Sequence, residues 1–424
     1  MVEPQQQEGR SRLTSIDVLR GVVVAGMVLV NSVSDEPEAP RWLLHVPPGV
    51  DGMTIADVVF PAFLCVVGLS IPLAMERQLE AGVSTRTVVL RVVARTLALL
   101  AMGVLMGGRA ENTAPSPRLW AGAMFVCFIA AFSTSTSRAP RTAALLRILR
   151  GLGWTGMVVL ALTHRGPAGE HLVLGPLFDP REREWLRHGW WDILGCIGWA
   201  YLAASTAYLA LRARPLLLFG GVPLGVLAWV AEREGLFAPA DGAQGAAAVA
   251  LAPIVWLSSH VSLGRQLGID AAITMAGCAL GASLLRHSGA THARWSLAVV
   301  AGCAIAGALL APGFGINKHA GTPSWALLSC AWTCVAWSFV YWGVELRRWR
   351  RGTTLLRLAG ANALLAYFIH PLLEGVVDVA YGLTSFADDG ARSASTVLVG
   401  AALMTAAVVI LTASAARRGM RLRV

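Results

Sequence analysis

The chain has 424 residues; 55% of them are hydrophobic, only 14% are charged, and the mean hydropathy is +0.60. Because soluble domains carry about 25% charged residues, this composition excludes an ordinary water-soluble protein. The net charge of +10 comes from arginines that cluster between apolar runs, which indicates orientation in a membrane and argues against nucleic acid as a partner.

Apolar runs of roughly 18 or more residues predict an all-α, polytopic helical membrane protein. Residues 1–11 form a polar N-terminal tail without the apolar core of a cleavable signal peptide. The first two expected spans are 16–33 and 53–75, joined by the polar loop 34–52. The third expected span ends near residue 106, and the fourth is 119–132. A basic loop at 138–150 separates it from the fifth, 152–163. The later expected spans are 193–211, 216–231, 297–310, 325–344, 355–373 and 397–413.

Two further segments, 246–263 and 269–285, both look long enough to cross. The positive-inside rule allows only one of them to do so, because two crossings would place ELRRWRRG (345–352) outside. The other is then re-entrant or lies along the interface. We therefore expect about twelve spans in a single transmembrane domain (12–415), a basic cytoplasmic tail (416–424) and no sizeable soluble domain.

The same rule predicts that both termini are cytoplasmic and that the loops of His45 and Lys318 face the outer side of a cell (inner) membrane. His45 precedes Asp51 in a Pro/Gly-rich loop, and Asp57 begins the second span, where a carboxylate is costly without a partner or a function. A histidine can act as a base, an acid or an acyl acceptor near neutral pH. The alternative is that His45 is a solvated loop residue.

Lys318 is the only lysine in the chain, in the Gly-rich stretch GFGINKHAG with Asn317 and His319. It is either an active-site cation or a helix-end anchor. Farther on, His370, Glu374 and Asp378 repeat every four residues and share one helix face. That face either lines a cavity or completes the helix in water.

In the first span, Asp17 and Arg20 are three residues apart on one face, and Asn31 lies at the far end. An anchoring pair at the membrane interface is the alternative reading of Asp17 and Arg20. The seven cysteines fall in apolar runs, and no His or carboxylate stands beside Cys330 and Cys334 at ligand spacing. We therefore expect neither a disulfide framework nor a metal site.

The segments RLTSIDVLRGVVVAGMVLVNS and DGMTIADVVFPAFLCVVGLSIPL resemble the opening of the heparan-α-glucosaminide N-acetyltransferase family and its bacterial relatives. The pattern of that family is roughly R-x-x-S-x-D-x-x-R-G, then N, then H, then N-G-x-T-x-A-D-x-x-F-P-x-F. The later motifs INK and GANALLAYFIHPLL are also similar to it. The matched pieces are scattered between residues 12 and 373.

This resemblance implies a membrane acyltransferase that moves an acetyl (acyl) group from acetyl-CoA, on the cytoplasmic side, to a sugar amine or hydroxyl at the outer face. It implies that a histidine, His45, is the base or acyl acceptor. The implied catalytic residues are His45, Asp57, Asn317 and Lys318, and the implied cofactor-binding residues are Asp17, Arg20, Asn31, Asn362 and His370. Arginines near Arg20, Arg91 and Arg95 are candidates for contacts to the CoA phosphates.

The chain departs from the family pattern between the histidine and the second motif. HVPPGVDG is two residues longer than the family spacing, and Asp51 replaces an asparagine. His319 and His370 are therefore alternative candidates for the catalytic histidine.

Two other functions compete with that of an acyltransferase. A multi-span transporter or flippase of a glycan or lipid-linked precursor would use a histidine–carboxylate relay, but no convincing inverted repeat is evident. A non-catalytic scaffold leaves the placement of Asp17, Arg20, Asp57 and Lys318 unexplained. The expected partners are the lipid bilayer and a small-molecule or glycan acceptor, and a homodimer is compatible with the sequence.

Overall fold

The computed structural model describes residues 13–107, 116–137, 139–165, 171, 188–212, 214–237, 246–287, 289–384 and 393–424. The first half contains α1 (Thr14–Asn31), η1 (Arg41–Leu43), α2 (Ile55–Glu80), α3 (Thr85–Gly107), α4 (Pro117–Phe132), β1 (Ser133–Ser135), α5 (Pro140–Thr163), η3 (His188–Trp191) and α7 (Asp192–Leu211). The second half contains α8 (Pro215–Phe219), α9 (Gly221–Arg233), α10 (Ala246–His260), η4 (Arg265–Asp270), α11 (Ala271–Arg286), α12 (Gly289–Phe314), α13 (Pro323–Tyr341), η5 (Trp342–Leu346), α14 (Thr354–Gly360), α15 (Ala363–Thr384), α16 (Ala394–Arg417) and β2 (Met420–Leu422).

Within these ranges, 10 helices are long and apolar enough to cross a membrane, or 11 if α14 and α15, which meet at a bend of 91°, form one broken span. The expectation of an all-α, multi-pass membrane protein is confirmed. The number is slightly below the expected twelve because α4, with 16 residues, falls short of the length that a bilayer requires.

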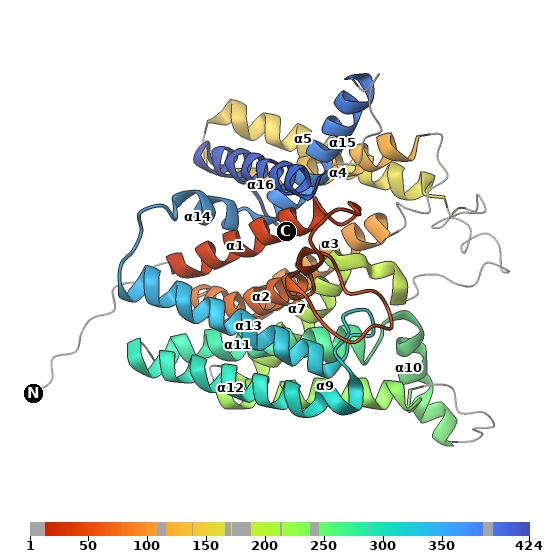
Figure 1. Cartoon of the computed structure of the whole chain (residues 1–424), viewed down its shortest axis with the longest axis vertical. Coiled ribbons are helices and arrows are strands. Elements are labelled where there is room, and N and C mark those ends of the chain that lie inside the picture. The colour runs from red at the N-terminus through yellow and green to blue at the C-terminus, as the bar shows by residue number, and fades with distance from the viewer. Residues whose placement is uncertain are drawn as a thin grey trace, which may run out of the picture.

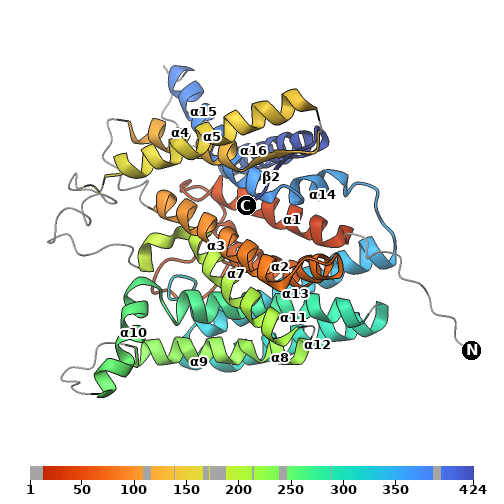
Figure 2. The ribbon, with the colours of Figure 1, turned by 180° about the vertical axis from the view of Figure 1, so that it is seen from behind.

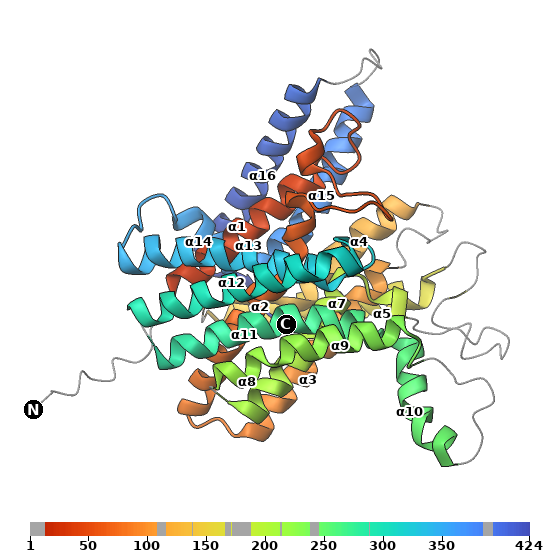
Figure 3. The same cartoon turned by 60° about the horizontal axis from the view of Figure 1, so that its bottom comes forward.

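The two ambiguous segments differ in the structure. η4 and α11 together form a candidate span, Arg265–Arg286, and most of it is buried inside the bundle. α10 is too short to count as a span in the described part of the chain, and Figure 3 shows it extending away from the other helices. Of the two segments as the structure describes them, the second is the one long and apolar enough to cross.

The fifth span is longer than expected. The basic stretch 138–150 was predicted as a loop, but one helix, α5, begins at Pro140 and includes Arg141, Arg147 and Arg150. Proline suits the first turn of a helix, and the leucines and isoleucine between the arginines favour its continuation. Long arginine stems can lie along an apolar surface while their charged ends reach water.

Helix α1 lies between α2 and α13 on one side and α14 and α16 on the other, as Figures 1 and 2 show from opposite sides. Glycines permit the closest helix contacts, as small residues do in membrane bundles. A Cβ added at Gly68 of α2 would collide with the backbone carbonyl of Thr274 in α11, and one at Gly21 of α1 would collide with that of Leu356 in α14. These contacts fix α1, which carries Asp17, Arg20 and Asn31, and α2, which carries Asp57.

The C-terminal segment packs against the helices. β2 pairs antiparallel with β1, with Leu422 opposite Ser133. The side chain of Asn362 accepts a hydrogen bond from the backbone N–H of Leu422 (2.9 Å) and donates one to the carbonyl of Met420 (3.2 Å). The segment expected as a basic tail therefore continues α16 to Arg417 and then forms a strand beside α15.

Candidate functional site

The first turn of α2 holds a buried carboxylate that faces the histidine loop. Thr54 precedes the helix and forms a capping box with Asp57: its backbone N–H donates to Oδ2 of Asp57 (3.0 Å). The hydroxyl of Thr54 and the backbone N–H of Val46 donate to the same oxygen. The other oxygen, Oδ1, lies 2.8 Å from Nδ1 of His45. Asp57 is fully buried. Because three donors hold Oδ2, the carboxylate is fixed with Oδ1 facing His45.

This contact determines which ring nitrogen of His45 carries the proton. A carboxylate only accepts hydrogen bonds, so a neutral His45 carries its proton on Nδ1 and donates it to Asp57. Its Nε2 then keeps a lone pair, which can act as a base or as a nucleophile. The side chain of His45 is 32% exposed and lines the cavity described below, so this nitrogen can meet a ligand.

Lys318 completes the group from the loop between α12 and α13. Its Nζ lies 3.1 Å from Nε2 and 3.2 Å from Nδ1 of His45. With the proton of His45 on Nδ1, the ammonium group donates to the lone pair of Nε2, so a ligand that reacts there takes the place of this hydrogen bond. Burial disfavours the charged form and lowers the pKa of Lys318 to about 8; nearby Asp57 opposes this shift and Arg265 adds to it. At neutral pH the ammonium group is therefore charged, but it gives up its proton more readily than a solvated lysine.

The two loops that carry His45 and Lys318 are bonded to each other. The carboxylate of Asp51 accepts from the backbone N–H of Ile316, and the N–H of Gly52 donates to the carbonyl of Ile316 (2.8 Å). The side chain of Asn317 donates to the carbonyl of Val50 (2.8 Å) and accepts from the N–H of Ala320 (2.9 Å). Asp51, one of the departures from the family pattern, is thus a link between the loops.

A cavity of about 1060 Å³ begins beside His45 and runs between α1, α2, α3 and α15. Five of the predicted site residues line it: Arg20, Asn31, His45, Lys318 and Asn362. The other four are placed behind its wall. Asp17 accepts a hydrogen bond from Arg20 (3.0 Å), and Asp57 contacts His45. Asn317 links the two loops through its hydrogen bond to Val50. Nε2 of His370 lies 3.1 Å from the hydroxyl of Ser32.

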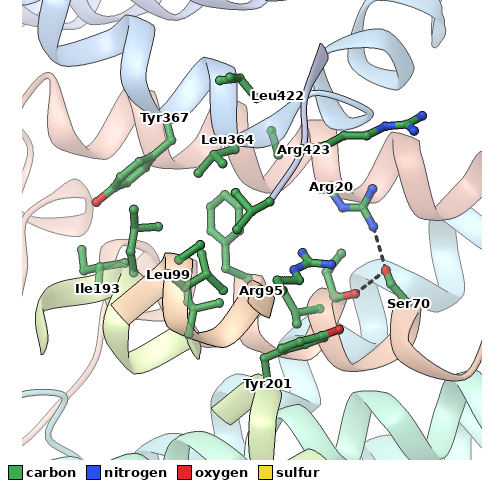
Figure 4. A pocket seen from close by; sticks show the side chains of 18 of the residues that line it. Arg20, Ser70, Arg95, Leu99, Ile193, Tyr201, Leu364, Tyr367, Leu422 and Arg423 are labelled. Carbon is green, nitrogen blue, oxygen red and sulfur yellow. Dashed lines mark hydrogen bonds between the residues drawn. The ribbon is translucent and has the colours of Figure 1, made fainter. Parts of the chain in front are cut away.

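The opposite end of the cavity is cationic, as Figure 4 shows for three of its arginines. Arg20 donates to the hydroxyl of Ser70 (2.7 Å), and the guanidinium of Arg95 lies 4.7 Å from the ring centre of Tyr201. The full set of arginines that line the cavity is Arg20, Arg91, Arg95, Arg150 and Arg423. Among the residues that the structure describes, no Asp or Glu lines this cavity.

The two ends lie far apart along α2. Asp57 holds His45 near the start of the helix, and Ser70 is 13 residues farther on, which is about 20 Å at 1.5 Å per residue. The wall between them is largely apolar, with Phe63 and Val67 on α2 and Leu99 on α3. The cavity therefore suits an elongated ligand with an anionic end.

Sequence reasoning missed two of the lining arginines. The sequence predicts Arg150 in a basic loop and Arg423 in a tail, but Arg150 belongs to α5 and Arg423 follows β2, and both line the cavity. The spacing of Arg147 and Arg150 could have indicated that a helix continues there. No local signal indicates that the strand 420–422 returns to the cavity, because its partner β1 lies some 287 residues earlier.

Comparison with known proteins gives partial matches. Residues 12–158 match a family described as a domain of unknown function (DUF5009). The chain is 30% identical to the heparan-alpha-glucosaminide N-acetyltransferase of Mus musculus over 101 residues, which are 24% of this chain and 15% of that protein. It is 30% identical to the Homo sapiens protein of the same name over 95 residues, 22% of this chain and 14% of that protein. The resemblance noted from the sequence motifs is confirmed, and the matched part is a small fraction of either relative.

Proposed function

We propose that the protein is a membrane acyltransferase that moves an acetyl group from acetyl-CoA to an amine or hydroxyl group of a sugar. The observation that carries this proposal is the group His45–Asp57–Lys318 at one end of a cavity whose other end is rich in arginine. The partial similarity to acetyltransferases supports it independently.

The chain supplies the groups that acyl transfer needs. Nε2 of His45 either removes the proton of the acceptor amine or hydroxyl, or itself accepts the acyl group. Asp57 orients the imidazole and stabilises its protonated form, as the carboxylate does in other histidine-based sites. The ammonium group of Lys318, 3.1 Å from His45, is placed to stabilise negative charge on a carbonyl oxygen that reacts there.

The far end of the cavity fits the donor. Coenzyme A carries phosphates at one end and a thioester at the end of a long, weakly polar arm. Arg20, Arg91, Arg95 and Arg150 would hold the phosphates, since guanidinium groups bind phosphate oxygens through paired hydrogen bonds. The stretch of about 20 Å between Asp57 and Ser70 leaves room for the arm to reach His45.

The same arrangement predicts which end of the cavity opens to the cytoplasm. Acetyl-CoA is made in the cytoplasm, so the arginine end would open there and His45 would serve an acceptor on the outer side of the cell (inner) membrane. This agrees with the arginine distribution along the chain, which predicts that both termini are cytoplasmic.

A direct test uses the purified protein in detergent with acetyl-CoA as donor and glucosamine as an acceptor probe. We expect saturable binding of acetyl-CoA and acceptor-dependent release of the CoA thiol. His45→Ala should retain the binding and lose the release. If the wild-type protein neither binds acetyl-CoA nor releases the thiol, the proposal fails, and the transporter alternative is then tested by flux of a glycan or lipid-linked precursor in sealed vesicles.

A further inference from the structure

Arg265 joins a buried part of the bundle to the loop of Lys318. It is the first residue of η4, a π-helical turn, and its Nη1 donates to the backbone carbonyls of Lys318 (2.8 Å) and His319 (3.4 Å). π-helical turns are rare and are frequently found at functional sites. A cation that binds the backbone of Lys318 controls where the ammonium group of that residue can lie.

The other side of Arg265 faces a buried carboxylate. Asp270 is fully buried, and neither of its oxygens accepts a hydrogen bond from the described residues. Nε of Arg265 lies 3.6 Å from Oδ1 of Asp270. Because an isolated buried carboxylate is strongly unfavourable, this ion pair holds the two side chains together.

A neighbouring helix, α9, fixes the start of the turn. Glu232 of α9 accepts from the hydroxyl of Ser262 and from the backbone N–H of Gly264, both at 2.6 Å. The same hydroxyl accepts from the backbone N–H of Arg265 (2.8 Å). Arg265 is therefore held at its own backbone as well as through Asp270.

Arg265 also contacts the half of the site that belongs to α2. Its guanidinium lies 5.2 Å from the ring centre of Trp325, and Nε1 of Trp325 donates to the backbone carbonyl of Asp57 (3.0 Å). Arg265 thus contacts the Lys318 loop directly, and Trp325 connects it to the first turn of α2, which carries Asp57. Arg265 does not line the cavity, so its action on a ligand is indirect.

We propose that Arg265 and Asp270 form a positioning pair that holds the Lys318 loop against His45 and sets the charge balance at the lysine. The catalytic purpose of the pair rests on the proposed function, but its effect on Lys318 does not. The charged or titratable groups that face Lys318 are His45 from its loop, Asp57 from α2 and Arg265 from η4.

The experiment uses the fact that Lys318 is the only lysine in the chain. Full-length protein that contains lysine labelled with ¹³C at the ε-carbon gives one lysine side-chain NMR signal, and Lys318→Arg must remove it. The chemical shift is followed from pH 6 to 11 in the wild type and in three variants: Arg265→Gln, Asp270→Asn and Arg212→Gln. The last is a matched control, since Arg212 pairs with Glu76 at 3.9 Å and does not contact the Lys318 loop.

The expected midpoint in the wild type is near pH 8. Arg265→Gln removes a neighbouring positive charge and should raise the midpoint by on the order of one pH unit. Asp270→Asn leaves that positive charge uncompensated and should lower the midpoint, while Arg212→Gln should leave it unchanged. If the pair held the loop without setting the charge balance at Lys318, both substitutions would only loosen the loop and move both midpoints upward. Such a common shift, or no shift in either variant, would overturn the proposal.

A second measurement connects the pair to catalysis. In the acetyl-transfer assay, Asp270→Asn should lower kcat by up to about a hundredfold, the effect of a small misplacement of a reacting group, with KM for acetyl-CoA unchanged. An increase in KM with kcat unchanged would contradict a positioning role. If the wild type shows no acetyl transfer, the proposed function fails, and the NMR titration still decides the inference about Arg265 and Asp270.

Discussion

Nζ of Lys318 lies 3.1 Å from Nε2 of His45, although the two residues are 273 positions apart in the sequence. Nδ1 of the same imidazole faces Asp57 at 2.8 Å. A carboxylate, an imidazole and a primary ammonium group thus meet at the end of a cavity, each from a different segment.

His45→Ala should lower acetyl transfer by roughly two to four powers of ten if His45 is a general base, and by more if it accepts the acyl group. His319→Ala and His370→Ala, measured in the same assay, should retain most of the activity. His370 is buried behind the cavity wall against Ser32, and His319 does not line the cavity. Full activity in His45→Ala, with loss in either of the others, would show that a different histidine does the chemistry.

Transfer should fall as the pH rises through about 8, because Lys318, with its lowered pKa, then loses the charge that stabilises the reacting oxygen. Lys318→Arg keeps its charge at that pH, so any remaining activity should persist to higher pH. Rate–pH profiles of the two proteins check this prediction. An alkaline limb that is the same in both would exclude Lys318 as its source.

The lowered pKa of Lys318 also has a consequence for stability. The unfolded chain holds the lysine proton up to pH 10.5, whereas the folded protein releases it near pH 8, so this residue should make unfolding less favourable as the pH rises between these values. Lys318→Met should lack this contribution. Thermal unfolding of both proteins in detergent at pH 7.5 and pH 10 measures it, and equal changes in Tm would contradict the prediction.

Arg150→Gln should raise KM for acetyl-CoA, since Arg150 lines the arginine end of the cavity. Losing one charged hydrogen-bond donor to phosphate typically costs about 1.5–3 kcal/mol, which corresponds to roughly a tenfold to hundredfold change. Arg147→Gln is the matched control, because Arg147 is on the same helix, one turn away, and does not line the cavity. Equal effects of the two substitutions would argue against a phosphate site there.

His319 and Arg348 should be labelled from opposite sides of the membrane. They flank the candidate span Pro323–Leu346, so a chain that crosses there separates them. The measurement places a single cysteine at either position in a protein whose seven native cysteines are replaced, and labels intact cells with a membrane-impermeant thiol reagent. Labelling of both from the same side would refute the predicted topology.

The sequence by itself determined the class of the protein and half of the site. Long apolar runs predict a helical membrane bundle, because a bilayer leaves no other partner for the backbone of a single span. The pair His45 and Asp57 was also predictable, since Thr54 and Asp57 form a local capping motif and only a short loop separates them from His45. Local spacing and hydropathy are sufficient for such features.

Only the tertiary structure decided which distant segments meet. The family resemblance implied that Lys318 acts with His45, but no local pattern indicates the hydrogen bonds between their loops. Nor does any local pattern indicate that Arg265 binds the backbone of Lys318, or that Asn362 fixes β2 and so brings Arg423 to the cavity. These relationships depend on how the helices pack, and glycine contacts such as that of Gly68 with Thr274 set that packing. Packing between helices far apart in sequence leaves no periodic signal in either one, so it cannot be read from local patterns.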